Sequence, residues 1–263
     1  MNHPIILLTD FGNNDLYAGV LRGVIQTRHP QARVLVLTHG IAPFNIIEAA
    51  HVLEAAYPYF PRGSIFVCVV DPGVGTRRKI LCLRTARHTF LAPDNGLLDL
   101  VKRRERKIQI RSVENKSFFA KDLSATFHGR DIFAPVAAAL SRRDVFKRLG
   151  PAVKSIAPLA VPEPRKNRGL LEGEVIYFDH YGNAVTNLRR AHAAQKEWER
   201  AAVYQGTRRL GPLAQTYGSA RPGLTALFDS FGRLELAWPH GSARAQSRLR
   251  AGSKVSVVYG TKK

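Results

Sequence analysis

The fold is decided by a stretch that reads SIFVCVVDPGVG and spans residues 64–75. The apolar run from Ile65 to Val70 is typical of a strand buried on both faces, and Asp71-Pro72-Gly73 ends it sharply. The run Ile5–Leu8 has the same character and is followed by Thr9-Asp10-Phe11-Gly12. Both patterns predict a buried strand with polar residues at its carboxyl end. In parallel sheets that edge is where ligands bind.

Strand and helix patterns alternate around these two runs. Residues 33–38, 79–85 and 88–92 read as further strands, and residues 13–28, 45–56 and 132–140 as helices. In the first helix, the apolar side is expected to carry Leu16, Val20, Leu21, Val24 and Ile25. This alternation predicts an α/β fold for residues 1–160: a Rossmann-like, mostly parallel sheet with helices on both faces.

The pattern changes near residues 157–169, which contain three prolines and few large apolar side chains. Residues 161–169 are therefore expected to be a linker. After it, short strands at 173–179, 201–204, 224–228, 233–237 and 254–259 are separated by Gly, Pro and Ser turns, with one helical turn at 192–199. This spacing predicts a smaller C-terminal β-barrel domain over residues 170–263.

Composition excludes several classes of protein. The 263 residues carry 40 Lys+Arg and 20 Asp+Glu, a net charge of +20, spread along the chain without a block of like charges. Only non-specific association with nucleic acid is expected from such a surface. The two cysteines exclude a disulfide framework, and the nine histidines show no metal-ligand spacing. No apolar run approaches the ~20 residues of a membrane span and no signal peptide is evident, so a soluble cytoplasmic protein is expected.

Each polar segment has a structural alternative when it is taken alone. Asp10 could cap the helix that starts near residue 13, and Asp71 could simply start a turn. His128 could be structural, and Asp131 could cap the helix from Ile132 while pairing with a surface Arg130. The glycines at 73 and 75 do not complete a dinucleotide or Walker motif. Cys68 lies in mid-strand and is expected to be an inert buried thiol.

Taken together, the segments resemble one family. The motifs are LTDFG (8–12), VDPGVGT (70–76), APDNGLL (92–98), TFHGRD (126–131), DHYGN (179–183) and DSFG (229–232). Their order and separation are similar to those of the S-adenosyl-L-methionine (SAM) hydroxide adenosyltransferases, SAM hydrolases related to fluorinases and chlorinases. The resemblance implies attack of a water-derived hydroxide on the ribose 5′ carbon of SAM, which yields adenosine and L-methionine. SAM is then the substrate, and neither a cofactor nor a metal is expected.

The resemblance also assigns roles. Asp71, Arg78 and His128 match the family's water-activating set, with Asp71 or His128 as base or orienting group and Arg78 stabilising the developing hydroxide. Arg78 is chosen over Arg77 because of its separation from Asp71. The substrate-binding residues implied are Asp10 for the ribose hydroxyls, Thr76 and Phe127 near the 5′ carbon, Asp179 and Ser230 for the methionine end, and Asn183 for adenine. Family members form homotrimers, so a homotrimer with active sites shared between subunits is expected.

Alternatives from other classes remain open at the level of sequence. A halide adenosyltransferase of the chlorinase kind is the rival within the family, although halogenating relatives have tyrosine at the position of His128. Fluorinases have serine at the position of Gly129. A SAM- or adenosine-binding protein with little turnover is a second alternative. Residues 238–243 are expected to meet adenine, and Trp238-Pro239 departs there from the family pattern.

Overall fold

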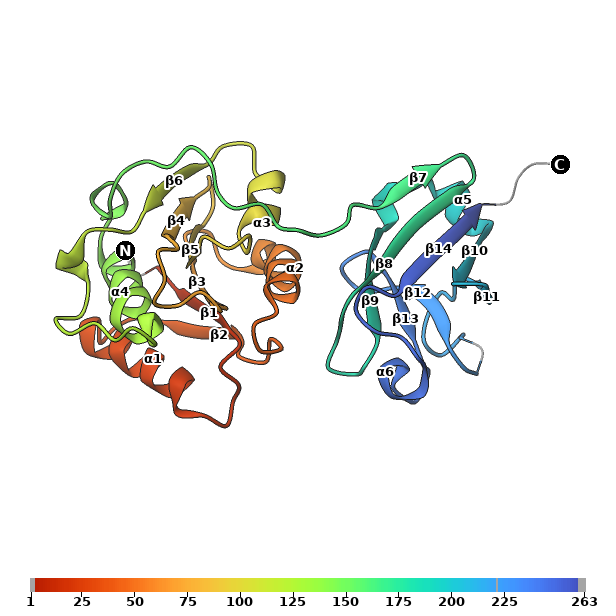
Figure 1. Ribbon diagram of the computed structural model, residues 1–263, viewed down its shortest axis with the longest axis horizontal. Coiled ribbons are helices and arrows are strands. Elements are labelled where there is room, and N and C mark those ends of the chain that lie inside the picture. The colour runs from red at the N-terminus through yellow and green to blue at the C-terminus, as the bar shows by residue number, and fades with distance from the viewer. Residues whose placement is uncertain (1–2, 221, 260–263) are drawn as a thin grey trace. The chain divides into compact units, whose positions relative to one another are not determined.

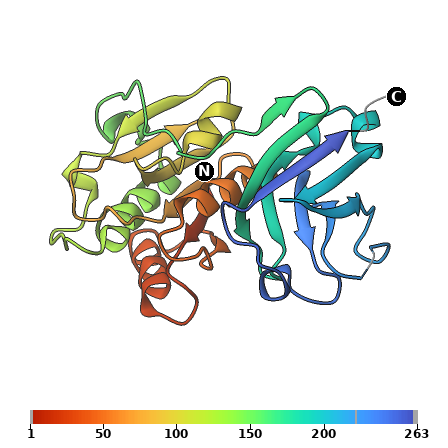
Figure 2. The same ribbon diagram turned by 45° about the vertical axis from the view of Figure 1, so that its right-hand side comes forward.

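The structure is a computed structural model that describes residues 3–220 and 222–259. The chain divides after Ala160 into two compact units, residues 1–160 and 161–263. Figures 1 and 2 show that the first unit mixes helices and strands, whereas the second is built mainly of strands.

The first unit contains six strands and four α-helices among its described residues. They are β1 (Ile5–Thr9), α1 (Leu16–Arg28), β2 (Val34–Thr38), α2 (Ile46–Ala56), β3 (Ile65–Val69), β4 (Ile80–Arg84), β5 (Thr89–Pro93), α3 (Asp99–Arg104), β6 (Gln109–Ser112) and α4 (Ala134–Arg142). Short helical turns lie at η1 (Tyr57–Tyr59), η2 (Lys116–Phe118), η3 (Gly129–Phe133) and η4 (Phe146–Arg148).

The sheet of this unit is mixed. Its strand order is β2-β1-β3-β5-β4-β6, with β2, β1, β3 and β5 parallel and β4 and β6 antiparallel to their neighbours. The carboxyl ends of β1, β3 and β5 therefore share one edge. The predicted parallel-containing sheet is confirmed, and the pair at 79–85 and 88–92 forms the expected antiparallel turn of β4 and β5.

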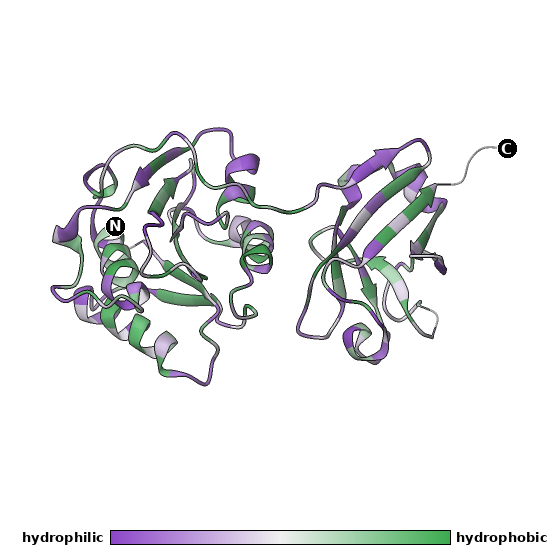
Figure 3. Cartoon of the chain, viewed as in Figure 1, coloured by the Kyte–Doolittle hydropathy of each residue, from purple (hydrophilic) through white to green (hydrophobic). Residues whose placement is uncertain are grey.

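Two apolar cores cover the two faces of the sheet because successive side chains of a strand point to opposite faces. Ile5 and Leu7 of β1 join the core under α1 and α4, whereas Ile6 and Leu8 join the core under α2 and α3. In Figure 3 the central strands are predominantly green, which reflects burial on both faces. The helices on opposite faces are thus held by alternate residues of the same strands.

Two helix predictions need correction. Helix α1 starts at Leu16 rather than near residue 13, and its buried residues are Ala18, Leu21 and Ile25. Leu16 is 63% exposed, so the predicted apolar side was wrong at that position. The helix predicted over 132–140 starts as a π-type turn at Gly129 before it becomes α4.

The second unit is an antiparallel, barrel-like sheet. Its elements are β7 (Arg165–Asn167), β8 (Leu170–Phe178), β9 (Ala184–Arg189), η5 (Arg190–His192), α5 (Gln195–Glu199), β10 (Ala201–Gln205), β11 (Arg208–Pro212), β12 (Thr225–Phe228), β13 (Arg233–Ala237), α6 (Ala243–Gln246) and β14 (Lys254–Tyr259). The strand order is β11-β10-β14-β8-β9-β13-β12, with β7 on β8. The backbone N–H of Ala214, just after β11, donates to Ala226 of β12 at 2.9 Å, which nearly closes the sheet.

Several elements of this unit were absent from the sequence prediction. Strands β9 and β11 were not predicted, and the expected linker 161–169 contains β7, which pairs with β8. The amide of Asn187 also donates to the carbonyl of Pro162 at 2.7 Å. Residues 162–167 are thus bonded into the second unit.

Candidate active site

Polar side chains gather at the carboxyl edge of the parallel strands. Asp10 follows β1 directly, Asp71 lies two residues after β3, and Asn95 lies two residues after β5. The Asn95 amide donates to the carbonyl of Val70 at 2.9 Å. This bond ties the β5 loop to the start of the segment that carries Asp71.

The segment from residue 71 to residue 78 is a compact loop. The Thr76 hydroxyl donates to the carbonyl of Gly73 at 2.7 Å and accepts the N–H of Arg78 at 3.3 Å. Gly75 has φ +78°, and a Cβ there would lie 2.4 Å from the carbonyl oxygen of Ala125. Glycine is required at this position because the left-handed conformation and the close approach both exclude a side chain.

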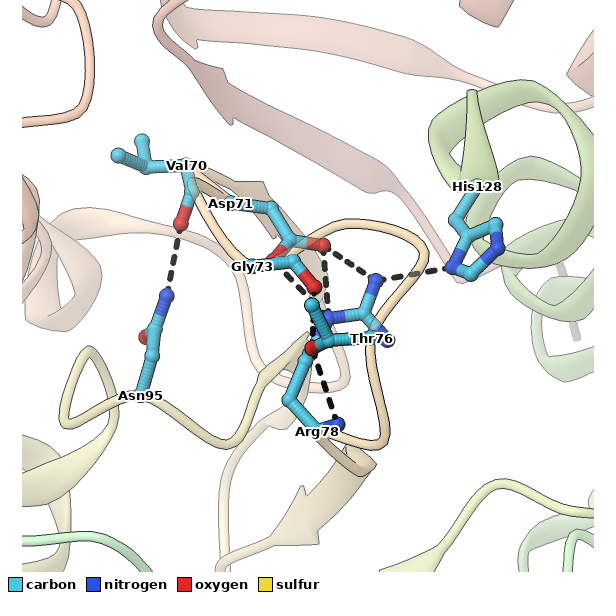
Figure 4. A network of polar contacts seen from close by, with 7 residues as sticks. All are labelled: Val70, Asp71, Gly73, Thr76, Arg78, Asn95 and His128. Carbon is cyan, nitrogen blue, oxygen red and sulfur yellow. Dashed lines mark hydrogen bonds and ion pairs between the residues drawn. The ribbon is translucent and has the colours of Figure 1, made fainter. Parts of the chain in front are cut away.

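Asp71, Arg78 and His128, which the family resemblance implies act together, form one connected group (Figure 4). Arg78 Nε lies 2.9 Å from each carboxylate oxygen of Asp71, and Arg78 Nη2 also donates to Asp71 Oδ2. The same Nη2 lies 2.9 Å from His128 Nδ1. The side chains of Arg78 and Asp71 are only 11% and 6% exposed, so this ion pair is shielded from water.

These contacts fix the state of the histidine. A guanidinium has donors and no acceptor, so Nδ1 of His128 must accept from Arg78 and the ring proton lies on Nε2. Burial lowers the pKa of His128, and the Arg78 charge lowers it further against the opposing effect of Asp71 and Asp131. His128 is therefore neutral near pH 7 and presents an N–H donor at Nε2.

Asp10 does not cap the first helix. Asp15 has that role, and Asp10 Oδ2 instead accepts the backbone N–H of Phe44 at 2.8 Å. Phe44 has φ +65°, an unusual conformation for a non-glycine residue, and its side chain is 69% exposed. Burial raises the pKa of Asp10, the Phe44 N–H opposes this, and the Asp71 charge adds to the increase.

Aromatic rings lie beside His128. Phe127 is buried, and its ring centroid lies 6.0 Å from that of Phe11 and 5.0 Å from that of Tyr17. A Cβ at Gly129 would lie 3.2 Å from the Phe127 ring and 3.3 Å from the Phe11 ring. The position after His128 is thus closely packed.

The next acidic residue also differs from the expectation. Asp131 lies inside the π-type turn and is 1% exposed, so it is not a helix cap. It pairs with Arg130 at 2.6 Å and accepts the N–H of Ser124 at 2.7 Å. Asp131 therefore stabilises the conformation of the 124–131 segment.

In the second unit, Asp179 and Asn183 lie together. Asp179 Oδ1 accepts the Asn183 backbone N–H at 2.8 Å, and Asp179 Oδ2 accepts its side-chain amide at 3.0 Å. A cavity of about 670 Å³ lies beside them, lined by Tyr181, Asn183, Tyr217, Gly218, Trp238, Pro239, His240 and Gly241. Ser230 is exposed in the turn after β12. The residues expected to meet adenine thus include several that line this cavity.

A buried pair in the same unit was missed by sequence reasoning. The Tyr217 hydroxyl donates to Glu235 Oε1, and Glu235 is 2% exposed on β13. Burial raises the pKa of Glu235 to about 7, and the charges of Asp179 and Asp229 add to it while the Tyr217 hydrogen bond opposes it. In the sequence Glu235 alternates with Leu234 and Leu236, so it resembles an outward-facing strand residue.

Over residues 3–220 and 222–259, no group of three or more His, Cys, Asp or Glu is placed to hold a metal ion. None of the helices in these ranges is long and apolar enough to cross a bilayer. The two cysteines, Cys68 and Cys82, are buried and unpaired, and burial raises the pKa of each thiol.

The fold and site define a mixed α/β protein with an acid–guanidinium–imidazole group at the carboxyl edge of its parallel strands. Residues 5–150 match the SAM hydroxide adenosyltransferase N-terminal domain, and residues 173–256 match the C-terminal domain of the same family. The chain belongs to the SAM hydroxide adenosyltransferase family.

Relatives and solved structures agree with this membership. The chain is 37% identical to a (R)-S-adenosyl-L-methionine hydrolase of Thermus thermophilus, over 97% of this chain and 99% of that protein. It is 25% identical to a fluorinase of an Actinoplanes species, over 97% of this chain and 98% of that protein. A crystal structure of an uncharacterized conserved protein from Thermotoga maritima has a TM-score of 0.88 at 35% identity, covering 97% of this chain and 99% of that one.

Proposed function

We propose that this protein hydrolyses SAM to adenosine and L-methionine. The observation that carries the proposal is the contact of Asp71, Arg78 and His128 in one shielded group. Relatives at 33–37% identity over nearly the whole chain are named (R)-S-adenosyl-L-methionine hydrolase, whereas the fluorinases are more distant at 23–25%.

The reaction requires activation of the nucleophile, because the leaving group needs no assistance. A water-derived hydroxide forms the new C–O bond at the ribose 5′ carbon while the C–S bond breaks, and the bonding electron pair leaves with sulfur. The sulfonium departs as a neutral thioether and needs no acid or Lewis acid, so we propose that neither metal nor cofactor takes part. Free water has a pKa near 15.7, so its deprotonation is the difficult part of the step.

We assign this task to three side chains that lie in contact. The Arg78 guanidinium carries a positive charge and would stabilise an anionic nucleophile. His128 would donate its Nε2–H to the same oxygen, since Nδ1 is occupied by Arg78. Neither group can take a proton in this arrangement, so Asp71 is the proposed acceptor, and its bonds to Arg78 orient it.

Other polar groups would hold the substrate. Asp10 retains one carboxylate oxygen that Phe44 does not occupy, and it would accept the ribose hydroxyls. Thr76, which accepts the backbone N–H of Arg78, and Phe127, which precedes His128, would lie near the 5′ carbon. Asp179 and Ser230 would bind the methionine end, with Asp179 suited to its ammonium group. The carbonyl oxygen of Asn183 would meet the adenine amino group.

The halide alternative is not favoured. A Cβ at Gly129 would lie 3.2 Å from the Phe127 ring and 3.3 Å from the Phe11 ring, so the serine of fluorinases would require these rings to shift by a few tenths of an ångström. His128 stands where halogenating relatives have tyrosine, and it is already bonded to Arg78. The packing at Gly129 thus disfavours the serine of fluorinases, whereas the histidine is the feature that favours water over halide as the nucleophile.

We also propose a fold type for each unit, an oligomeric state and a cellular location. The first unit is of Rossmann-like type and the second is a small β-barrel. A homotrimer with active sites shared between subunits accords with the family resemblance, and a cytoplasmic location is the expectation from the sequence. The exposed side chain of Phe44, whose backbone N–H binds Asp10, supports an assembly that covers apolar surface at this point.

Hydrolysis in oxygen-18 water tests the function. The label is expected in the 5′ hydroxyl of adenosine and absent from methionine, as read by mass spectrometry. A parallel reaction with chloride should give no 5′-chloroadenosine. Unlabelled adenosine would refute hydroxide attack, and tight SAM binding with no product would favour a non-catalytic binding protein.

A further inference from the structure

The pair of Tyr217 and Glu235 lies outside the set of residues that the proposed function uses. Glu235 is one of the most deeply buried acidic side chains, at 2% exposure, and it accepts the Tyr217 hydroxyl proton. Burial of a carboxylate is unfavourable unless it is hydrogen-bonded. The Tyr217 hydroxyl is therefore a partner that Glu235 requires.

Tyr217 stands between this buried carboxylate and the 670 Å³ cavity. Its side chain is 49% exposed, and with Trp238 and Asn183 it forms part of the cavity lining. The hydroxyl end of Tyr217 is thus anchored below the surface while its ring remains available to a ligand.

The surroundings of Glu235 strengthen this anchoring. Asp179 and Asp229 both repel its charge, and Asp229 Oδ1 is held by the backbone N–H groups of Phe231 and Arg233 at 2.8 Å each. The two aspartates face Glu235 from the turns after β8 and β12, and Tyr217 faces it from the 213–220 segment. A hydrogen bond from a neutral phenol relieves this crowding of carboxylates without introducing a competing cation.

We propose that Glu235 is a positioning residue that fixes the Tyr217 ring as a stacking wall for the purine base of the substrate. The inference rests on the proposed function and extends it to the recognition of the base. A planar base gains from stacking on an aromatic ring, and the gain is largest where the ring is already held in place. Neighbouring Asn183 supplies the polar contact that stacking alone lacks.

Three variants test the pair, read as KM and kcat for SAM and as the Kd of adenosine. Tyr217→Phe keeps the ring and loses the anchor, and Glu235→Leu removes the acceptor. Each should raise KM about tenfold, equivalent to 1.4 kcal/mol, with kcat within about twofold of the parent. Glu235→Gln keeps a carbonyl acceptor for the phenol and should restore KM to within about twofold. The double variant Tyr217→Phe/Glu235→Leu should be no worse than either single change, because both remove the same bond.

A matched control removes a phenol hydroxyl elsewhere in the same unit. Tyr204 lies on β10 and does not line the cavity, so Tyr204→Phe should leave KM and kcat unchanged. Melting temperatures of all variants separate folding from recognition. A loss of kcat and stability with unchanged KM would overturn the positioning role, as would additive effects in the double variant. Failure of the parent protein to cleave SAM would instead refute the proposed function, while the adenosine Kd would still report on the pair.

Discussion

Replacing Arg78 by alanine should nearly abolish SAM hydrolysis and also weaken the fold. Arg78 makes two kinds of contact at once: Nε and Nη2 bind Asp71, and Nη2 binds His128. Alanine removes the positive charge next to the nucleophile and leaves Asp71, 6% exposed, as a carboxylate without its partner. His128 loses its hydrogen-bond donor in the same change.

The magnitudes follow from these two losses. Removing one donor that stabilises developing negative charge typically lowers kcat by 10²–10³-fold. Breaking a buried ion pair by deleting one partner costs about 3–5 kcal/mol of stability. Water can enter the space left by the arginine and solvate Asp71, so about 3 kcal/mol is the better expectation. Arg78→Lys keeps the charge without the planar fork and should lose about tenfold in kcat.

The assay is chromatography of adenosine formed at saturating SAM, with thermal unfolding measured on the same samples. Arg77→Ala is the matched control, because Arg77 is the adjacent arginine, is exposed, and has no side-chain hydrogen bond or ion pair within the described part of the chain. It should retain the parent rate and stability. A folded Arg78→Ala protein with parental kcat, or a loss confined to Arg77→Ala, would refute the assignment.

Two further predictions concern pH and the 71–78 loop. Protonation of His128 removes the acceptor for Arg78, and its pKa is lowered from the ordinary value, so kcat/KM should fall only below about pH 6.5. Between the lowered pKa of folded His128 and the ordinary value of about 6.5, the unfolded chain binds more protons than the folded one. The free energy of unfolding should therefore rise with pH across this window. A His128→Asn protein whose residual rate keeps the same acid limb would contradict this. Gly75→Ala should cost about 1–3 kcal/mol of stability, since its Cβ meets the Ala125 carbonyl in a left-handed conformation. Gly12→Ala, with φ +72° but open space, should cost less in the same thermal assay, and equal losses would show that the contact with Ala125 is unimportant.

The buried strands and the active-site edge could be predicted from sequence because their signals are local. An apolar run that ends in Asp-Pro-Gly marks both β3 and the position of Asp71. The contact between Arg78 and His128, fifty residues apart, followed only from the family resemblance, and the structure places the two side chains 2.9 Å apart. Asp179 and Asn183 also lie together, a contact that was not predicted because the resemblance assigns them to the methionine end and the adenine end of the substrate.

Other features depend on tertiary context that sequence periodicity does not carry. Strand β11 begins with Arg208 and Arg209 and forms through pairing with β10 rather than through an apolar pattern. Leu16 has the spacing of a core residue, yet it is the first residue of α1 and is 63% exposed. Glu235 occupies a polar position in an alternating strand, and the tyrosine that makes its burial tolerable lies eighteen residues earlier. The pairing partner of such a residue has no sequence signature.

The close approach of Gly75 to the Ala125 carbonyl bears on how the family could evolve a different nucleophile. It couples two loops mechanically, one carrying the guanidinium and the other leading into the imidazole. A change at residues 124–126, none of which is expected to touch the reacting atoms during turnover, would shift the separation of those two groups. Substitutions in the 124–126 loop would thus change which nucleophile the site prefers while Asp71, Arg78 and His128 stay the same.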